Sequence, residues 1–168
     1  KNKKNFYFSS KFIEGVEWEK VMASKIFRGF KKIDFTYNKI ASTLPTEMGT
    51  RMTNLQQFKI RANSFTGPLP TELGLMTNFR ILKLKSNSFS GPLPTQLGSL
   101  TLLSRLKVNS NMHSSSIPTQ LGKLKDMTVM KMANNNLCGE IPTEVVALMN
   151  QQGVDYKIHG GNSIESEC

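Results

Sequence analysis

The chain has 168 residues, which is enough for one domain with a substantial buried core. Its formal net charge of +10 is unevenly placed, since residues 1–34 sum to +5, residues 35–133 to +9 and residues 134–168 to −4. This basic surface favours an anionic partner, and a basic face that only maintains solubility is the alternative interpretation. No run of 18 apolar residues occurs, so we expect no membrane-spanning segment in this sequence.

Residues 1–32 form the first region, in which lysine and arginine alternate with aromatic residues. Four positions match the spacing of a degenerate repeat: Phe6, Phe8, Ile13 and Gly15. The apolar residues between Trp18 and Ile26 predict one short amphipathic helix. Because the end of a repeat array exposes apolar side chains, we interpret residues 1–32 as a basic N-terminal arm and cap.

Residues 33–153 contain about five copies of a 24-residue repeat. Two consecutive copies read NSFTGPLPTELGLMTNFRILKLKS and NSFSGPLPTQLGSLTLLSRLKVNS. The first interval between equivalent asparagines is 25 residues, and we expect a surface loop near Thr50 to absorb the extra residue. The sequence therefore predicts a solenoid rather than a domain with one central core.

Each repeat contains a short segment in which apolar and polar residues alternate, followed by an asparagine at a regular interval. The alternation predicts a strand with one buried face; its apolar pairs are Ile33 and Phe35, Phe58 and Ile60, Leu82 and Leu84, Leu106 and Val108, and Met130 and Met132. An asparagine amide can donate and accept hydrogen bonds inside a tight turn, so stacked asparagines would satisfy buried backbone groups. We expect such a structural ladder at Asn38, Asn63, Asn87, Asn111 and Asn135.

The pattern LxLxxNxFxGPLPTxLGxLTxL resembles the plant-specific class of leucine-rich repeat, as in receptor-kinase ectodomains, polygalacturonase-inhibitor-like proteins and algal relatives. The resemblance covers about residues 30–148. It implies a right-handed curved solenoid, an α/β-type repeat fold with short parallel strands on the concave face and irregular or 3-10 returns on the convex side. The paired-cysteine N-terminal cap, a kinase domain and a transmembrane segment are not in this sequence, so a signalling role is not carried over.

Residues 154–168 are expected to form a C-terminal cap strand and an acidic tail. Counting 24 residues from Asn135 reaches His159, which we interpret as a substitute in the asparagine ladder. The two cysteines are Cys138 and Cys168. Either they form a disulfide that ties the tail to the last full coil or they remain free thiols, because spacing alone does not establish geometry.

The residues between the buried strand positions should point to the concave face, because side chains alternate along a strand. One column reads Asp34, Lys59, Lys83, Lys107, Lys131 and Asp155, and a second reads Thr36, Arg61, Lys85, Asn109, Ala133 and Lys157. A lysine column is more than stability requires, since like charges opposite one another in a sheet are unfavourable. The predicted partner-binding residues are therefore Lys59, Arg61, Arg80, Lys83, Lys85, Arg105, Lys107 and Lys131, with the two terminal aspartates bounding the footprint.

The function we predict is non-enzymatic: the basic concave face docks an acidic surface of a partner protein. The alternatives are a binder of polyanionic cell-wall polysaccharide, or an accessory subunit of a larger assembly held by its N-terminal arm and convex face. Nucleic acid is disfavoured, because the concave columns contain no aromatic stacking platform. The chain is expected to be a monomer or a subunit of a hetero-complex.

No catalytic or metal-binding motif appears in the sequence, and no cofactor or metal is expected. His113 falls at a core position, where we interpret it as the mark of a distorted coil rather than as a catalytic base. The resemblance implies a secreted or cell-surface protein. An organelle lumen is the alternative, because no N-x-[ST] acceptor occurs and no N-terminal targeting segment is visible.

Overall fold

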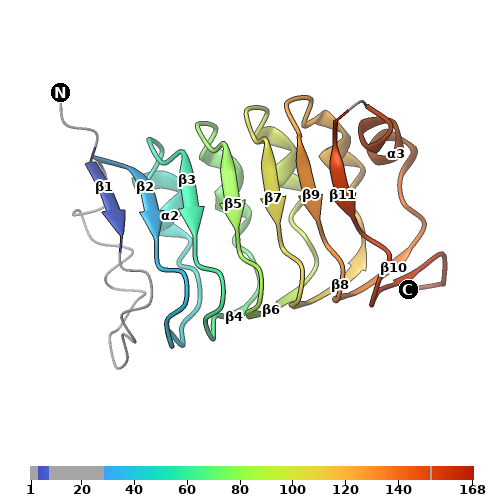
Figure 1. The fold of residues 1–168 in the computed structure, drawn as a ribbon, viewed down its shortest axis with the longest axis horizontal. Coiled ribbons are helices and arrows are strands. Elements are labelled where there is room, and N and C mark those ends of the chain that lie inside the picture. The colour runs from blue at the N-terminus through green and yellow to red at the C-terminus, as the bar shows by residue number, and fades with distance from the viewer. Residues whose placement is uncertain (1–3, 8–28, 152) are drawn as a thin grey trace.

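The computed structural model describes residues 4–7, 29–151 and 153–168, and these residues form a curved solenoid. Seven parallel strands lie side by side along one face (Figure 1). In spatial order they are β1 (Lys4–Tyr7), β2 (Phe30–Asp34), β3 (Gln57–Lys59), β5 (Ile81–Lys83), β7 (Arg105–Lys107), β9 (Val129–Lys131) and β11 (Asp155–Lys157). The predicted fold class is confirmed, with each repeat contributing one concave strand.

A second sheet of five short parallel strands follows the asparagine turns, in the order β12-β10-β8-β6-β4. Its strands are β4 (Thr66–Gly67), β6 (Ser88–Gly91), β8 (Met112–Ser116), β10 (Asn136–Gly139) and β12 (Ser163–Ile164). These strands add a second set of hydrogen bonds between neighbouring coils, besides those of the seven-stranded sheet. The position of one coil therefore determines the position of its neighbour along the whole array.

Short helical turns return the chain on the convex side. Three are 3-10 helices, namely η2 (Thr71–Leu75), η3 (Thr95–Ser99) and η4 (Thr119–Lys123). Two are α-helices, namely α2 (Glu47–Arg51) and α3 (Thr143–Met149). Each begins at a Pro-Thr step, with proline directly before η2, η3, η4 and α3 and directly before the N-cap Thr46 of α2. Proline lacks a backbone N–H, and at the start of a helix this costs nothing because no helical carbonyl precedes it.

The extra residue of the first repeat is absorbed near Thr50 as predicted, but the segment is helix α2 and not the expected surface loop. In η2 the amide of Met76 donates to the carbonyl of Leu73, three residues back. In α2 the amide of Met52 donates to the carbonyl of Met48, four residues back. One inserted residue thus widens a 3-10 turn into an α turn, and the buried methionine that closes the turn keeps its place in the core.

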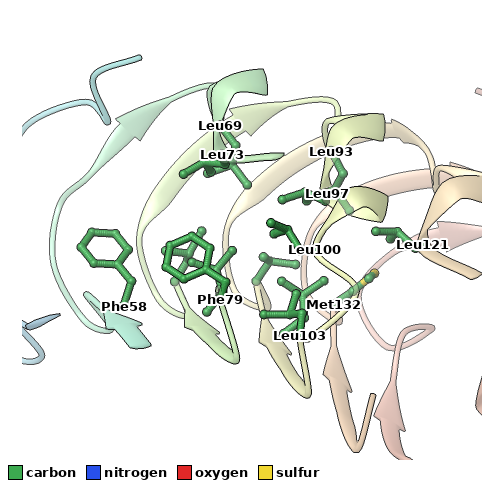
Figure 2. Close-up of a cluster of buried hydrophobic side chains, with 14 of the residues drawn as sticks. Phe58, Leu69, Leu73, Phe79, Leu93, Leu97, Leu100, Leu103, Leu121 and Met132 are labelled. Carbon is green, nitrogen blue, oxygen red and sulfur yellow. The ribbon is translucent and has the colours of Figure 1, made fainter. Parts of the chain in front are cut away.

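The buried core extends along the described solenoid, between the concave strands and the convex turns. Figure 2 shows Phe58 and Phe79 together with leucines of the convex turns, such as Leu73 and Leu97. The alternating apolar pairs predicted from the sequence are all fully buried, with 0% exposure. Each coil therefore contributes apolar side chains from both of its long sides.

The asparagine amides bridge neighbouring coils. Nδ2 of Asn87 donates to the carbonyl of Leu84 in its own coil and to that of Ile60 in the preceding coil, both at 2.9 Å. Its Oδ1 accepts the amide of Phe65 at 3.1 Å. Bonds of the same kind are made by Asn63, Asn111 and Asn135. The residue before each ladder asparagine is left-handed, with φ between 55° and 59° at Tyr37, Ala62, Ser86, Ser110 and Asn134.

In the last coil the ladder residue is Asn162, so the assignment of His159 is wrong. Nδ2 of Asn162 donates to the carbonyl of Met132 at 3.0 Å, and its Oδ1 accepts the amide of Leu137 at 3.1 Å. Gly161 precedes it with φ of 72°, which is the left-handed position found before every other ladder asparagine. The residues inserted in this coil move the asparagine beyond the position that strict counting gives.

Cys138 and Cys168 form a disulfide that spans 30 residues, as the first of the two sequence alternatives proposed. The pairing of β10 with β12 and the bond from the amide of Gly139 to the carbonyl of Ser166 hold the same segment. The acidic tail therefore lies against the last full coil.

At the N-terminal end, β1 pairs in parallel with β2, and Phe6 lies opposite Ile33. The ring of Phe6 packs edge-on against Phe30 and Phe35, with centroids 5.3 and 5.6 Å apart. The expected amphipathic helix between Trp18 and Ile26 lies outside the described residues, as do Phe8, Ile13 and Gly15.

Candidate interaction surface

The strand register aligns four lysines across the concave sheet. Lys59 lies opposite Lys83, Lys83 opposite Lys107, and Lys107 opposite Lys131. Asp34 precedes them opposite Lys59. Neighbouring strands are about 4.8 Å apart, so these side chains form one closely spaced column across the sheet.

The column ends in a fifth lysine, which corrects the predicted end at Asp155. Lys157 lies opposite Lys131, and Asp155 lies opposite Val129 at the strand entrance. Relative to the count of 24, strand β11 is shifted by two residues, whereas the ladder asparagine is shifted by three, from 159 to 162. Asp155 nevertheless reaches Lys131, with which it forms an ion pair.

Two adjoining hollows cover this column, with volumes of about 350 and 300 Å³. The first includes Asp34, Thr36 and Tyr37 among its lining residues, and the second includes Asn109 and Ala133. Lys85 and Lys107 line both. We call the combined feature the basic trough; its cationic residues are Lys59, Arg61, Lys83, Lys85, Lys107, Lys131 and Lys157.

Two lysines of the column are neutralised within the chain, whereas the two that lie between them are not. Lys59 is 3.3 Å from Asp34, and Lys131 pairs with Asp155. Among the described residues, no carboxylate lies within ion-pair distance of Lys83 or Lys107. The pKa of Lys83 is lowered, first by desolvation and then by the charges of Lys59, Lys107 and Arg105, while the more distant carboxylate of Asp34 acts in the opposite direction. The central ammonium groups therefore repel one another in the free protein.

Arg61 is held in place at one side of the trough. Its guanidinium lies over the ring of Tyr37, with Cζ 4.9 Å from the ring centroid. Its Nε is buried and has no hydrogen-bond partner in the described structure, and the same holds for Oδ1 of Asn109. Two buried polar atoms of trough-lining residues thus have unused hydrogen-bonding capacity in the described structure.

Six of the eight predicted binding residues line the two hollows, and two do not. Arg80 and Arg105 are exposed near the strand entrances and line neither hollow. Sequence reasoning missed Tyr37, which is 48% exposed and lines the trough. Tyr37 lies outside the two columns compared in the sequence and adds one aromatic side chain to the trough lining. Tyr37 escaped notice because the equivalent residues of later coils are small or polar: Ala62, Ser86, Ser110 and Asn134.

His113 is a core residue in an undistorted coil, so the expected distortion is wrong. Its ring is fully buried and stacks on Phe89 at 6.4 Å, extending the stack of Phe89 on Phe65. Nδ1 is 3.2 Å from the carbonyl of Gly91. Ser115 adopts φ of 68°, close to the 71° of Gly91 one coil earlier, so the turn keeps its shape without glycine.

The described part of the chain contains no group of three or more His, Cys, Asp or Glu side chains arranged to hold a metal ion. In the same residues, no helix has both the length and the apolar character that crossing a bilayer requires.

Comparison with solved structures identifies the class of this fold. The plant peptide hormone receptor RGFR1, solved in complex with RGF2, matches with a TM-score of 0.76 and 25% identity over 82% of this chain and 21% of the receptor. The TDR receptor matches with a TM-score of 0.74 and 30% identity over 80% of this chain and 23% of that one. The leucine-rich-repeat ectodomain of the receptor kinase SOBIR1 from Arabidopsis thaliana matches with a TM-score of 0.66 and 24% identity over 75% of this chain and 67% of that one.

The chain thus has the leucine-rich-repeat fold of plant receptor-kinase ectodomains, and the predicted resemblance is confirmed. It spans less than a quarter of the length of RGFR1 and TDR. No protein-family model matches the sequence, and no curated protein sequence matches it.

Proposed function

We propose that this protein is a non-enzymatic interaction module whose basic trough binds an acidic segment of a partner protein. One observation carries the proposal: Lys83 and Lys107 stand in register at the centre of the concave face without a neutralising carboxylate among the described residues. Since like charges opposite one another destabilise a sheet, an anionic ligand would relieve a cost that the free protein carries.

Solved relatives of the same fold support a binding role. RGFR1 is solved with RGF2, and the Arabidopsis receptor kinase HAESA is solved with the peptide hormone IDA and the co-receptor SERK1. Solenoids of this kind offer extended concave surfaces to their partners. We extend to this chain only the general role of binding a protein or peptide, and its charge defines the acidic character of the ligand.

The test is a charge reversal with a matched control. The variant Lys83→Glu/Lys107→Glu changes the centre of the trough, and Lys123→Glu/Lys125→Glu makes the same charge change at exposed convex positions. Binding of a labelled oligoglutamate peptide is measured by fluorescence anisotropy at low and at physiological ionic strength. We expect the trough variant to bind at least about tenfold more weakly and the convex variant to bind as the unmodified protein does. Equal affinity in all three proteins would contradict the proposal.

Two alternatives give different outcomes in the same assay. Polygalacturonate, a polyanionic polysaccharide, would bind with many proteins per chain and a steep salt dependence, whereas a peptide saturates at a fixed stoichiometry. An accessory subunit held by residues 1–32 and the convex face would keep its assembly when the trough lysines are reversed. We further propose a secreted or cell-surface location, supported by the disulfide and the ectodomain fold, with an organelle lumen as the alternative.

A further inference from the structure

The basic trough runs across the strands, so a rod-shaped ligand lying in it must follow the solenoid axis. Along that axis it meets one lysine of the column per coil, at intervals of about 4.8 Å. The column extends without interruption over five coils, from Lys59 to Lys157. The spacing of charges on the ligand therefore decides how many lysines are neutralised at once.

Two common conformations of an acidic peptide do not match this spacing. An extended peptide rises about 3.4 Å per residue and places every second side chain on one face, so its charges recur every 6.8 Å or so. After two coils, about 9.6 Å, the nearest charge of such a peptide is about 3 Å out of phase with the lysine. A polyproline II segment repeats every three residues, or about 9.3 Å. One face of it would reach Lys59 and Lys107 and leave Lys83 without a carboxylate.

An α-helix matches better, because one turn rises about 5.4 Å and each turn can present one carboxylate. The three intervals between Lys59 and Lys131 cover about 14.4 Å, against roughly 16.2 Å for three helical turns. The difference is spread over four flexible four-carbon side chains, which can lean along the axis. The register can therefore be kept over the whole footprint.

We propose that the trough binds an amphipathic α-helix with a single acidic stripe, one carboxylate per turn, laid along the solenoid axis. This inference rests on the proposed function and specifies the conformation of its partner. The stripe would follow the spacing i, i+4, i+7 and i+11, which keeps side chains on one helical face.

The extent of the lysine column sets the length of this helix. Lys59 and Lys131 are already paired with Asp34 and Asp155, so among the described residues the unpaired lysines of the column are Lys83 and Lys107 between them and Lys157 beyond Lys131. Lys85, which lines both hollows, adds a further cation beside Lys83 and Lys107. A stripe of three to four turns, about 16 to 22 Å long, would follow the column from Lys59 to Lys157, whose four intervals cover about 19 Å.

The experiment compares peptides of identical composition. One carries its glutamates in a single helical stripe, an isomer distributes the same glutamates around the helix, and a third is the striped peptide with a central proline. Affinity is measured by fluorescence anisotropy, and peptide helicity by circular dichroism on binding. Glutamates at i and i+4 repel one another in the free peptide, so neutralisation by the lysines should increase its helicity.

We expect the striped peptide to bind roughly tenfold more tightly than its isomer, since two further neutralised pairs of modest strength give about that ratio. The proline peptide should lose this advantage, and the variant Lys83→Gln/Lys107→Gln should abolish the difference between isomers. Equal binding of both isomers without gained helicity would overturn the inference and leave the proposed function standing. Failure of all three peptides to bind would overturn the proposed function as well.

Discussion

His113 shows how one side chain joins the packing of three coils. It continues the stack formed by Phe65 and Phe89, and its backbone amide donates to Oδ1 of Asn135 at 3.0 Å. Nε2 is buried without a partner in the described structure. Protonation there would place an uncompensated charge in the core, so burial lowers the pKa of the ring.

This lowered pKa predicts a loss of stability in mild acid. An unfolded histidine titrates near pH 6.5, so below about that pH the unfolded chain binds a proton that the folded chain resists. The free energy of unfolding should then fall with decreasing pH, by up to about 1.4 kcal/mol per pH unit, until the folded pKa is reached. Urea denaturation of the unmodified protein and of His113→Phe, between about pH 7.5 and 5.5, checks this expectation.

The phenylalanine variant should lose that slope while extending the aromatic stack. His159→Gln, at an exposed position, is the control and should keep it. A slope of the same size in the His113→Phe variant would show that other groups cause the acid sensitivity.

At the scale of the element, the four convex turns α2, η2, η3 and η4 are packed so closely against the next turn that each has room only for glycine at one position. A Cβ on Gly74 would lie 2.6 Å from the carbonyl oxygen of Gln96 in the next turn. Gly49, Gly98 and Gly122 meet the next coil in the same way. The glycine in the Leu-Pro-Thr-x-Leu-Gly run therefore reflects the approach of neighbouring backbones, not a special backbone conformation.

Gly74→Ala separates this packing effect from helix propensity. Propensity alone would favour alanine by about 1 kcal/mol in a helix. The close backbone contact should instead make the variant less stable by about 1–3 kcal/mol, since neither backbone can move without shifting a coil. The urea midpoint of Gly74→Ala is compared with that of Leu75→Ala, an exposed neighbour in the same turn. A Gly74→Ala protein as stable as the unmodified one would disprove the packing argument.

At the scale of the whole molecule, the sequence predicted the fold because each coil contacts mainly its neighbours. Strand positions, buried pairs and convex turns repeat at a fixed interval, so one correctly read repeat locates the next. That method failed where the interval changed. Residues inserted before Asn162 moved Lys157 into the lysine column and Asp155 to the strand entrance. Nothing in the period indicated where the inserted residues would be placed, and the Gly161–Asn162 step was the available signal.

The candidate site was less predictable than the fold, because it depends on where long side chains end. Six of the eight residues that the sequence predicts to bind line the trough. The alternation of side chains along the strands did not show that Arg80 and Arg105 lie outside it. It also could not show which lysines are paired within the chain. Lys59 and Lys131 are matched by aspartates, and only coordinates reveal that the pairing stops short of the centre.

This charge arrangement predicts opposite effects of one substitution on stability and on binding. Lys83→Gln removes the central charge from a column in which Lys59 and Lys107 lie directly opposite it. The free protein should become more stable by a few tenths to about 1 kcal/mol, and the gain should shrink as salt screens the repulsion. Affinity for an acidic peptide should fall, as expected when a functional site is held at a cost to stability.

Urea denaturation at low and high salt measures the change in stability, and fluorescence anisotropy measures the change in affinity. The exposed convex variant Lys125→Gln is the control. If Lys83→Gln destabilises the free protein at low salt, the lysines contribute packing that outweighs their repulsion, and an uncompensated column no longer explains the need for an anionic partner.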